Sequence, residues 1–177
     1  MPKIYVIGSV ASGKTTLAKQ LSNTLKIPWY ELDNVVHERL KSGDRKRRPE
    51  ERDIVFNGII DSEPWIIEGV WRDCFDRGFE DADIIILLDT PTYVRKYRIA
   101  TRWIRQRLKL EKAHYRPTLK MLSMMYRWSN VFERTKGRLF KVLQPYEDKV
   151  IILKNNNNIE GVVKKYKIEN LVEKVGE

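Results

Sequence analysis

The sequence predicts an α/β fold in which a five-stranded parallel sheet is flanked by helices. Short apolar runs rich in β-branched residues alternate with segments in which apolar residues recur at helical spacing. One run, 84–88, is continuously apolar, as expected of a strand that is buried on both faces. A glycine-containing loop, 8–15, joins the first run to the first helical segment. Together these observations favour a parallel sheet with helical crossovers.

Composition limits the class of protein. The chain has 177 residues, of which 42% are hydrophobic, so we expect one domain, 1–177, with its own core. Cys74 is the only cysteine, which excludes an internal disulfide and a cysteine metal cluster. No stretch approaches the ~18 apolar residues of a membrane span, and no signal peptide precedes the glycine-containing loop. The expectation is a cytoplasmic protein without a membrane partner, either a monomer or a weak dimer.

The loop Gly-Ser-Val-Ala-Ser-Gly-Lys-Thr at 8–15 fits the phosphate-binding pattern G-x-x-x-x-G-K-[ST]. It has the context that this pattern requires, because a predicted strand (3–7) precedes it and a predicted helix (15–25) follows it. Lys14 is expected to reach the β- and γ-phosphates, and Thr15 to hold Mg²⁺. The residues predicted to bind a nucleotide here are Gly8, Ser9, Ala11, Ser12, Gly13, Lys14, Thr15 and Thr16.

Polar residues follow further predicted strands, at the end where ligands bind in open parallel sheets. Asp33 follows the strand 29–32, and it suits a substrate hydroxyl or a Mg²⁺-bound water as well as the N-cap of a helix over 34–40. Glu68 and Arg72 follow the strand 65–67, where Glu68 could hold a water on Mg²⁺ and Arg72 an anionic group. The alternative for these two is a mutual surface ion pair. Gly69 between them would allow close approach of a ligand.

Asp89 ends the most apolar strand, 84–88, and resembles the acid that holds Mg²⁺ in many phosphate-loop enzymes. Thr90 and Pro91 follow directly, and they predict a helix with Thr90 as its cap. Near the C-terminus, 148–154 reads as the fifth strand. The asparagine run 155–158 after it is either a base-binding loop or a spacer.

The positive charge is concentrated in one segment. The net charge is +10, yet residues 92–143 carry 15 Lys and Arg against two acids, a net of +13, so the remainder is −3. Two helices are expected there, the second over 118–143. On the first helix, one predicted face carries Arg95, Arg98, Arg102, Arg105 and Lys109, and a predicted buried stripe carries Val94, Tyr97, Thr101, Ile104 and Leu108. Such a basic hairpin is typical of a lid over a nucleoside triphosphate or of a nucleic-acid footprint; a solvated face is the third interpretation.

The order of these motifs resembles the adenylate-kinase-like phosphate-loop (P-loop) nucleoside and nucleotide kinases, and most closely the proteins called DNA topology modulation proteins. The resemblance covers most of the chain and rests on four segments: 8–16, 31–36, 65–70 and 118–122. It implies a three-layer P-loop kinase fold with a helical lid over about 92–143.

The resemblance also implies roles for residues. Glu68-Gly69-Val70-Trp71-Arg72 stands where adenylate kinases have D-G-F-P-R, whose arginine binds the acceptor phosphate. Arg98 and Arg102 match lid arginines that lie near the adenine and the phosphates, and Asn155 lies in the loop that holds the adenine. The T-G-D-x-x-R segment of adenylate kinases is absent. Asp33 therefore looks more like the aspartate of small-molecule kinases in this superfamily, which meets a substrate hydroxyl.

These features lead to the hypothesis of a phosphotransferase that uses ATP and Mg²⁺. The acceptor would be a small molecule or a nucleotide, bound by Asp33, Glu68 and Arg72. Catalysis would depend on Lys14, Asp33, Arg98 and Arg102, and the metal on Thr15, Glu68 and Asp89. Two alternatives remain open: a nucleic-acid-binding protein that uses the basic hairpin, and a small NTPase.

Overall fold

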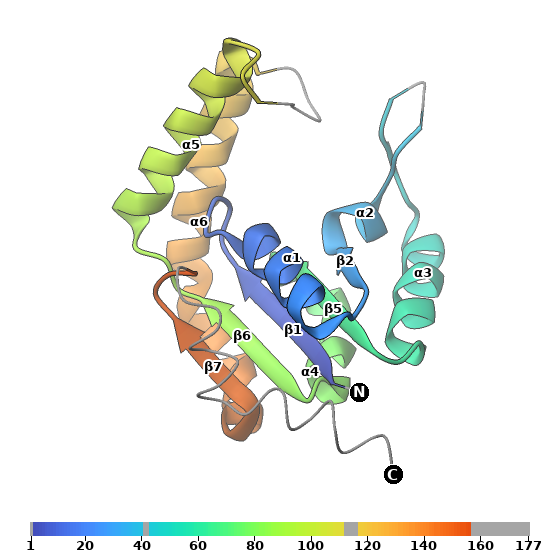
Figure 1. Ribbon diagram of the computed structural model, residues 1–177. Coiled ribbons are helices and arrows are strands. Elements are labelled where there is room, and N and C mark those ends of the chain that lie inside the picture. The colour runs from blue at the N-terminus through green and yellow to red at the C-terminus, as the bar shows by residue number, and fades with distance from the viewer. Residues whose placement is uncertain (1, 41–42, 112–116, 157–177) are drawn as a thin grey trace.

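The computed structural model describes residues 2–40, 43–111 and 117–156. A five-stranded sheet runs through its centre in the order β2-β5-β1-β6-β7, and every neighbouring pair is parallel (Figure 1). The strands of this sheet are β1 (Lys3–Gly8), β2 (Trp29–Glu31), β5 (Trp65–Gly69), β6 (Ile84–Leu88) and β7 (Val150–Leu153). The predicted α/β class and the predicted five-stranded parallel sheet are confirmed.

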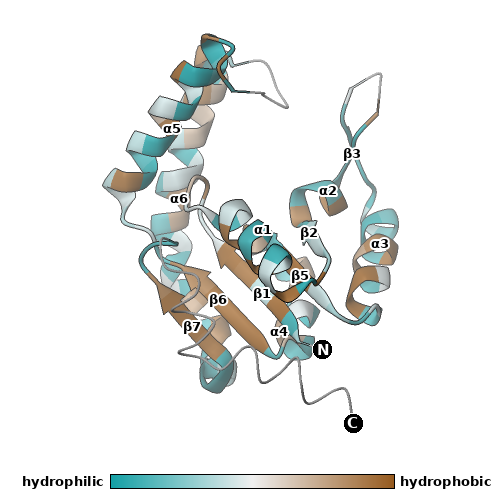
Figure 2. Ribbon diagram, viewed as in Figure 1, coloured by the Kyte–Doolittle hydropathy of each residue, from teal (hydrophilic) through white to brown (hydrophobic). Residues whose placement is uncertain are grey.

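Helices cover both faces of the sheet. The helices are α1 (Lys14–Leu25), α2 (Leu32–Val36), α3 (Pro49–Asp61), α4 (Arg77–Asp81), α5 (Thr92–Arg107) and α6 (Leu119–Leu143), with short 3₁₀ helices η1 (Asp73–Phe75) and η2 (Gln144–Lys149). The apolar strands lie between these layers (Figure 2). None of the described helices is both long enough and apolar enough to cross a membrane.

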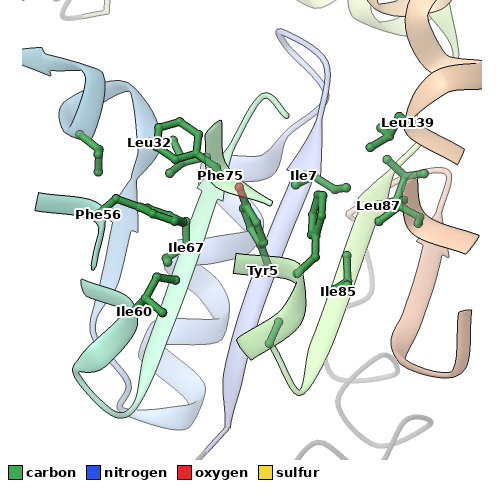
Figure 3. Close-up of a cluster of buried hydrophobic side chains, with 14 of the residues drawn as sticks. Tyr5, Ile7, Leu32, Phe56, Ile60, Ile67, Phe75, Ile85, Leu87 and Leu139 are labelled. Atoms are coloured by element: carbon green, nitrogen blue, oxygen red, sulfur yellow. The ribbon is translucent and has the colours of Figure 1, made fainter. Parts of the chain in front are cut away.

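The core has two parts because strand side chains alternate between the two faces. On one face, Leu17 and Leu21 of α1 pack against Ile4 and Val6 of β1 and their neighbours. The larger cluster on the other face brings side chains of α2, α3, α4 and α6 onto the sheet around Tyr5 (Figure 3). Both clusters lie below the carboxyl ends of the strands, so these ends are held by rigid elements.

The segment after β2 differs from the prediction. The expected helix over 34–40 ends at Val36, and His37–Glu38 form strand β3, which pairs with β4 (Arg45–Lys46) as an antiparallel hairpin. Arg45 explains the difference, because its guanidinium binds Glu38 across the hairpin and Glu51 at the start of α3. These contacts hold the hairpin in place of a helix that would have only about one further turn.

Helices α5 and α6 pack against each other and form an arm that projects beyond the strand ends (Figure 1). Helix α5 begins at Thr92, so Thr90 is not its cap as predicted. The predicted buried stripe was also wrong: Tyr97, Ile104 and Leu108 are exposed, while Arg95, Ile99 and Gln106 are the buried residues of α5. Burial of Arg95 is made possible by its ion pair with Glu133 and by a bond to the Thr92 hydroxyl.

Candidate active site

The phosphate loop connects the buried end of β1 to the first turn of α1. Ala11 and Gly13 have φ of 58° and 103°, the left-handed region that turns the backbone sharply. The Nζ of Lys14 donates to the Ser9 carbonyl across the loop at 2.9 Å. The buried hydroxyls of Ser9 and Ser12 have no hydrogen-bond partner within the described part of the chain. Such unpaired donors beside a buried lysine fit the oxygens of a phosphate.

Three distant segments hold the carbonyl side of this loop. The Ser12 carbonyl accepts from the Thr90 hydroxyl at 3.0 Å and from Nη1 of Arg98 at 2.8 Å. The Gly13 carbonyl accepts from the Asn156 amide at 3.4 Å. Because these bonds use carbonyl groups, they fix the loop and leave its N–H groups for an anion. Thr90, expected to be a helix cap, therefore supports the loop instead.

Thr15 and Glu68, both predicted to bind metal, lie together. The Thr15 hydroxyl donates to Oε1 of Glu68 at 2.6 Å. Burial raises the pKa of Glu68, while the charge of Lys14 and the bond from Thr15 oppose that shift. Burial lowers the pKa of Lys14, and Glu68 and Asp33 oppose that shift. A hydroxyl beside a carboxylate suits Mg²⁺, which is commonly held by one or two protein oxygens together with phosphates and waters.

Asp89, the third predicted metal ligand, is paired with two lysines. One of its oxygens binds Lys154 at 2.5 Å and the other pairs with Lys136 of α6. Burial raises the pKa of Asp89, but the two lysines outweigh it and hold that pKa below its ordinary value. With both oxygens taken, Asp89 joins the arm and the end of β7 to β6. Of the predicted acids, Glu68 is the one bonded to the Thr15 hydroxyl, which is predicted to hold Mg²⁺.

Asp33 and Arg72, predicted to bind the acceptor, form an ion pair. Nη2 of Arg72 lies 3.1 Å from Oδ1 of Asp33, so the alternative pairing of Arg72 with Glu68 was wrong. Nη1 of Arg72 is buried and has no partner among the described residues. Gly69 serves a purpose other than ligand approach: a Cβ there would lie 2.6 Å from Cβ of Leu32, so the glycine admits α2, which carries Asp33.

A pocket of about 300 Å³ lies between the loop, α5 and the segment after β7. Its lining residues are Ala11, Gly13, Thr16, Arg98, Thr101, Arg102, Arg105, Glu111 and Asn156. Arg98 and Arg102 therefore come to the loop as predicted, and Arg105 joins them. Asn156 lines the pocket, whereas Asn155, the predicted residue, is exposed and does not. The asparagine run signalled the loop, but only the fold selects which member faces the pocket.

Sequence reasoning missed the residues that brace this site. Lys136 joins α6 to Asp89 at the end of β6, and Lys154 joins the end of β7 to the same carboxylate. Arg95 pairs with Glu133 and so joins the two helices of the arm. Arg95 was assigned to the predicted basic face of the first arm helix, so its buried position facing α6 was not anticipated. The partners in these ion pairs lie far apart in the chain. Arg95 and Glu133 are 38 positions apart, and Lys154 and Asp89 are 65 positions apart. Such separations leave no local pattern.

Known proteins resemble this chain in structure. No protein-family model and no curated protein matches the sequence. Solved structures do match: shikimate kinase from Acinetobacter baumannii in complex with shikimate has a TM-score of 0.60 at 15% identity, covering 98% of this chain and 94% of that chain. Shikimate kinase from Bacteroides thetaiotaomicron has a TM-score of 0.58 at 16% identity, covering 97% and 98%.

A gluconokinase from Sinorhizobium meliloti 1021 matches with a TM-score of 0.55 at 16% identity, covering 98% of this chain and 95% of that chain. The chain has the P-loop kinase fold. At such low identities the likeness concerns the fold, and the reaction must be argued from the side chains.

Proposed function

We propose that this protein with the P-loop kinase fold is an ATP- and Mg²⁺-dependent phosphotransferase that acts in the cytoplasm on a small acceptor. One observation carries the proposal: donor and acceptor groups converge on Lys14. The charges that act on the pKa of Lys14 are those of Glu68, Asp33, Arg102 and Arg72. A buried lysine surrounded by the phosphate loop, a metal-binding pair and a separate acid–arginine pair is the arrangement that phosphoryl transfer requires.

The proposed roles follow from position. The loop and Lys14 hold the β- and γ-phosphates, while Arg98 positions the loop and Arg102 neutralises charge on the transferred group. Thr15 and Glu68 would hold Mg²⁺, which would supply positive charge to offset that of the phosphates. Asp33 receives the proton of the acceptor hydroxyl. Arg72, with a buried unpaired Nη1, binds an anionic or polar group of the acceptor.

The whole chain 1–177 is proposed to be one domain, with the α5–α6 arm as the lid that closes over the nucleotide. The resemblance of its motifs supports placing it among the adenylate-kinase-like kinases, with the DNA topology modulation proteins. The absent T-G-D-x-x-R segment and the Asp33–Arg72 pair favour an acceptor with a free hydroxyl over AMP.

The test is ATP consumption with a panel of nucleosides, nucleotides and small hydroxy acids and sugars, with Lys14→Ala as the control. We expect one acceptor class to stimulate ADP formation, and Lys14→Ala to lower that rate by about 10³-fold or more, because Lys14 stabilises charge on the transferred group. Hydrolysis at one rate, whichever acceptor is present, would instead identify an NTPase. No turnover with any acceptor would refute the kinase proposal.

A further inference from the structure

Helix α6 carries a row of cations on the side that faces away from α5. Lys120, Arg127, Arg134 and Lys141 recur every seven residues, and all four are exposed. Seven residues are nearly two helical turns, so positions drift by only about 20° per repeat and the four share one face. On the opposite side, Ser129 is buried against α5. We call these four residues the outer basic stripe.

The outer basic stripe has no compensating acid. Within residues 2–40, 43–111 and 117–156, none of its four side chains forms an ion pair. The one acid on α6, Glu133, is bound to Arg95 of α5. The other cations of the C-terminal half of α6 are paired, Lys136 with Asp89 and Arg138 with Asp73. Unpaired cations are thus confined to the outer side.

The stripe is separate from the candidate active site. The cations of the arm that line the nucleotide pocket, Arg98, Arg102 and Arg105, all come from α5. None of the stripe residues lines that pocket. The charge excess of 92–143 therefore has two parts, one directed at the phosphate loop and one directed away from it. Phosphate binding at the active site explains only the first part.

We propose that the outer basic stripe binds the phosphate backbone of double-stranded nucleic acid without sequence selectivity. From Lys120 to Lys141 the row extends about 31 Å at 1.5 Å per residue. A duplex presents one negative charge per ~1.7 Å of its axis, so the row matches about nine base pairs of backbone. A straight, rigid row of single cations suits a long, straight polyanion.

The surroundings of the stripe favour a duplex over other polyanions. Between its members lie Ser123, Asn130 and Gly137, at the same seven-residue spacing. The buried apolar residues of α6 pack against α5 and the core. Its exposed apolar residues, Leu119, Trp128, Val131 and Phe140, lie at positions spread around the helix, so they do not form the continuous apolar face that insertion into lipid requires. The exposed aromatic residues of α6, Trp128 and Phe140, each lie about 100° around the helix from the neighbouring stripe residue, Arg127 or Lys141. Base stacking, on which binding of single strands depends, is therefore not offered.

Salt dependence gives the first measurement. Four phosphate contacts predict a slope of log K against log salt of about −3.6, since each contact contributes about −0.9. Binding of a labelled duplex of about 30 base pairs, in two unrelated sequences, is measured by fluorescence anisotropy over a salt series. We expect both sequences to bind the full chain equally, with a slope at least this steep.

A matched pair of variants gives the second measurement. The stripe variant is Lys120→Gln, Arg127→Gln, Arg134→Gln and Lys141→Gln. The control variant is Lys26→Gln, Lys46→Gln, Lys96→Gln and Lys109→Gln, four exposed lysines that share no face. Both variants lower the net charge from +10 by four. We expect the stripe variant to bind the duplex about 100-fold more weakly or worse, and the slope of log K against log salt to become less steep by about three to four. The control variant should change the binding constant by less than about fivefold.

Several outcomes would overturn the proposal: equal weakening by both variants, tighter binding of a single strand, no duplex binding at low salt, or equal stripe-dependent binding to phosphatidylserine vesicles. Circular dichroism spectra verify that both variants are folded. ATP turnover of the stripe variant should equal that of the unmodified chain. Loss of duplex binding with turnover retained, or the reverse, therefore separates this proposal from the proposed kinase activity.

Discussion

Asp33 lies in α2, a five-residue helix, and its carboxylate pairs with Arg72 beyond the end of β5. Both side chains are partly exposed, so the pair contributes little to stability. Its significance is positional, because a carboxylate held next to the phosphate loop can take a proton from an acceptor hydroxyl. Arg72 orients that carboxylate, while its buried Nη1 has no partner in the described part of the chain.

We expect Asp33→Asn to lower the acceptor-dependent rate by about 10²- to 10⁴-fold, because the amide keeps the shape and cannot accept the proton. The KM for ATP should not change, since the nucleotide contacts are made elsewhere. Steady-state kinetics with the acceptor found in the panel provide the measurement. The control is Asp61→Asn, a carboxylate that pairs with Arg77 in another part of the surface. An unchanged rate in Asp33→Asn would exclude Asp33 as the base.

Gly69→Ala tests the contact that positions α2. The added Cβ would lie 2.6 Å from Cβ of Leu32 and must displace the helix that carries Asp33. We expect a loss of about 1–3 kcal/mol in the free energy of unfolding and a lower acceptor-dependent rate. Urea denaturation and kinetics measure both. The control, Gly58→Ala in α3, meets no atom within 4 Å and should stabilise the chain slightly.

At the level of elements, the start of α3 is tied to the β3–β4 hairpin by one carboxylate. Glu51 accepts from the backbone N–H of Arg48 and from the guanidinium of Arg45. The bond from the Arg48 backbone, followed by the bond from Arg45, lowers the pKa of Glu51 to about 2. The hairpin and α3 flank α2, so this contact also supports the acceptor side of the site.

This lowered pKa predicts a dependence of stability on pH. A carboxylate whose pKa is depressed on folding stabilises the protein above its ordinary pKa of 4.5, and the contribution is lost as the pH falls towards about 2. We expect Glu51→Gln to lower the urea midpoint at pH 7 and the difference from the unmodified chain to vanish between pH 4.5 and 2. Glu50→Gln, in the same helical turn, is the control. A difference that persists at pH 2 would contradict this assignment.

Ion pairs hold the base of the arm formed by α5 and α6. Arg95 is fully buried in α5 and pairs with Glu133 of α6, and Lys136 pairs with Asp89 at the end of β6. A buried charge left without its partner is strongly unfavourable, so these pairs hold the two helices in one register. Arg102 and Arg105 are carried further out along α5 and face the loop.

For the whole molecule, the loop, the arm and the segment after β7 meet at one pocket. Binding there should stabilise the entire fold, because a ligand that binds only the folded state raises its free energy of unfolding. With a non-hydrolysable ATP analogue and Mg²⁺ at 100 times the Kd, we expect a gain of about 2.7 kcal/mol. Denaturation midpoints over a ligand series provide the measurement. Lys14→Ala should abolish the gain, and a gain that survives this change would place the nucleotide elsewhere.

Much of this fold could be predicted because its signals are local. The run Ile84–Leu88 is apolar throughout and forms a central, fully buried strand as expected. The loop over 8–15 matches the phosphate-binding pattern with consecutive residues, so the pattern alone predicted the donor side of the site. Pro49, Glu50 and Glu51 are likewise a local signal, because a proline and acids in the first turn favour the start of a helix such as α3.

The sequence by itself determined the sheet, the phosphate loop and which residues follow the strand ends, because strand and helix periodicities are properties of neighbouring positions. Only the tertiary structure decided that Arg72 pairs with Asp33, that Glu68 lies at Thr15, and that Asn156 faces the pocket. The physical reason is that a helical or strand repeat tells which residues share a face, whereas the partner that the face meets comes from chain segments far away in the sequence. For α5 this mattered most: its buried face is completed by Glu133 of α6, which allows an arginine to take a core position.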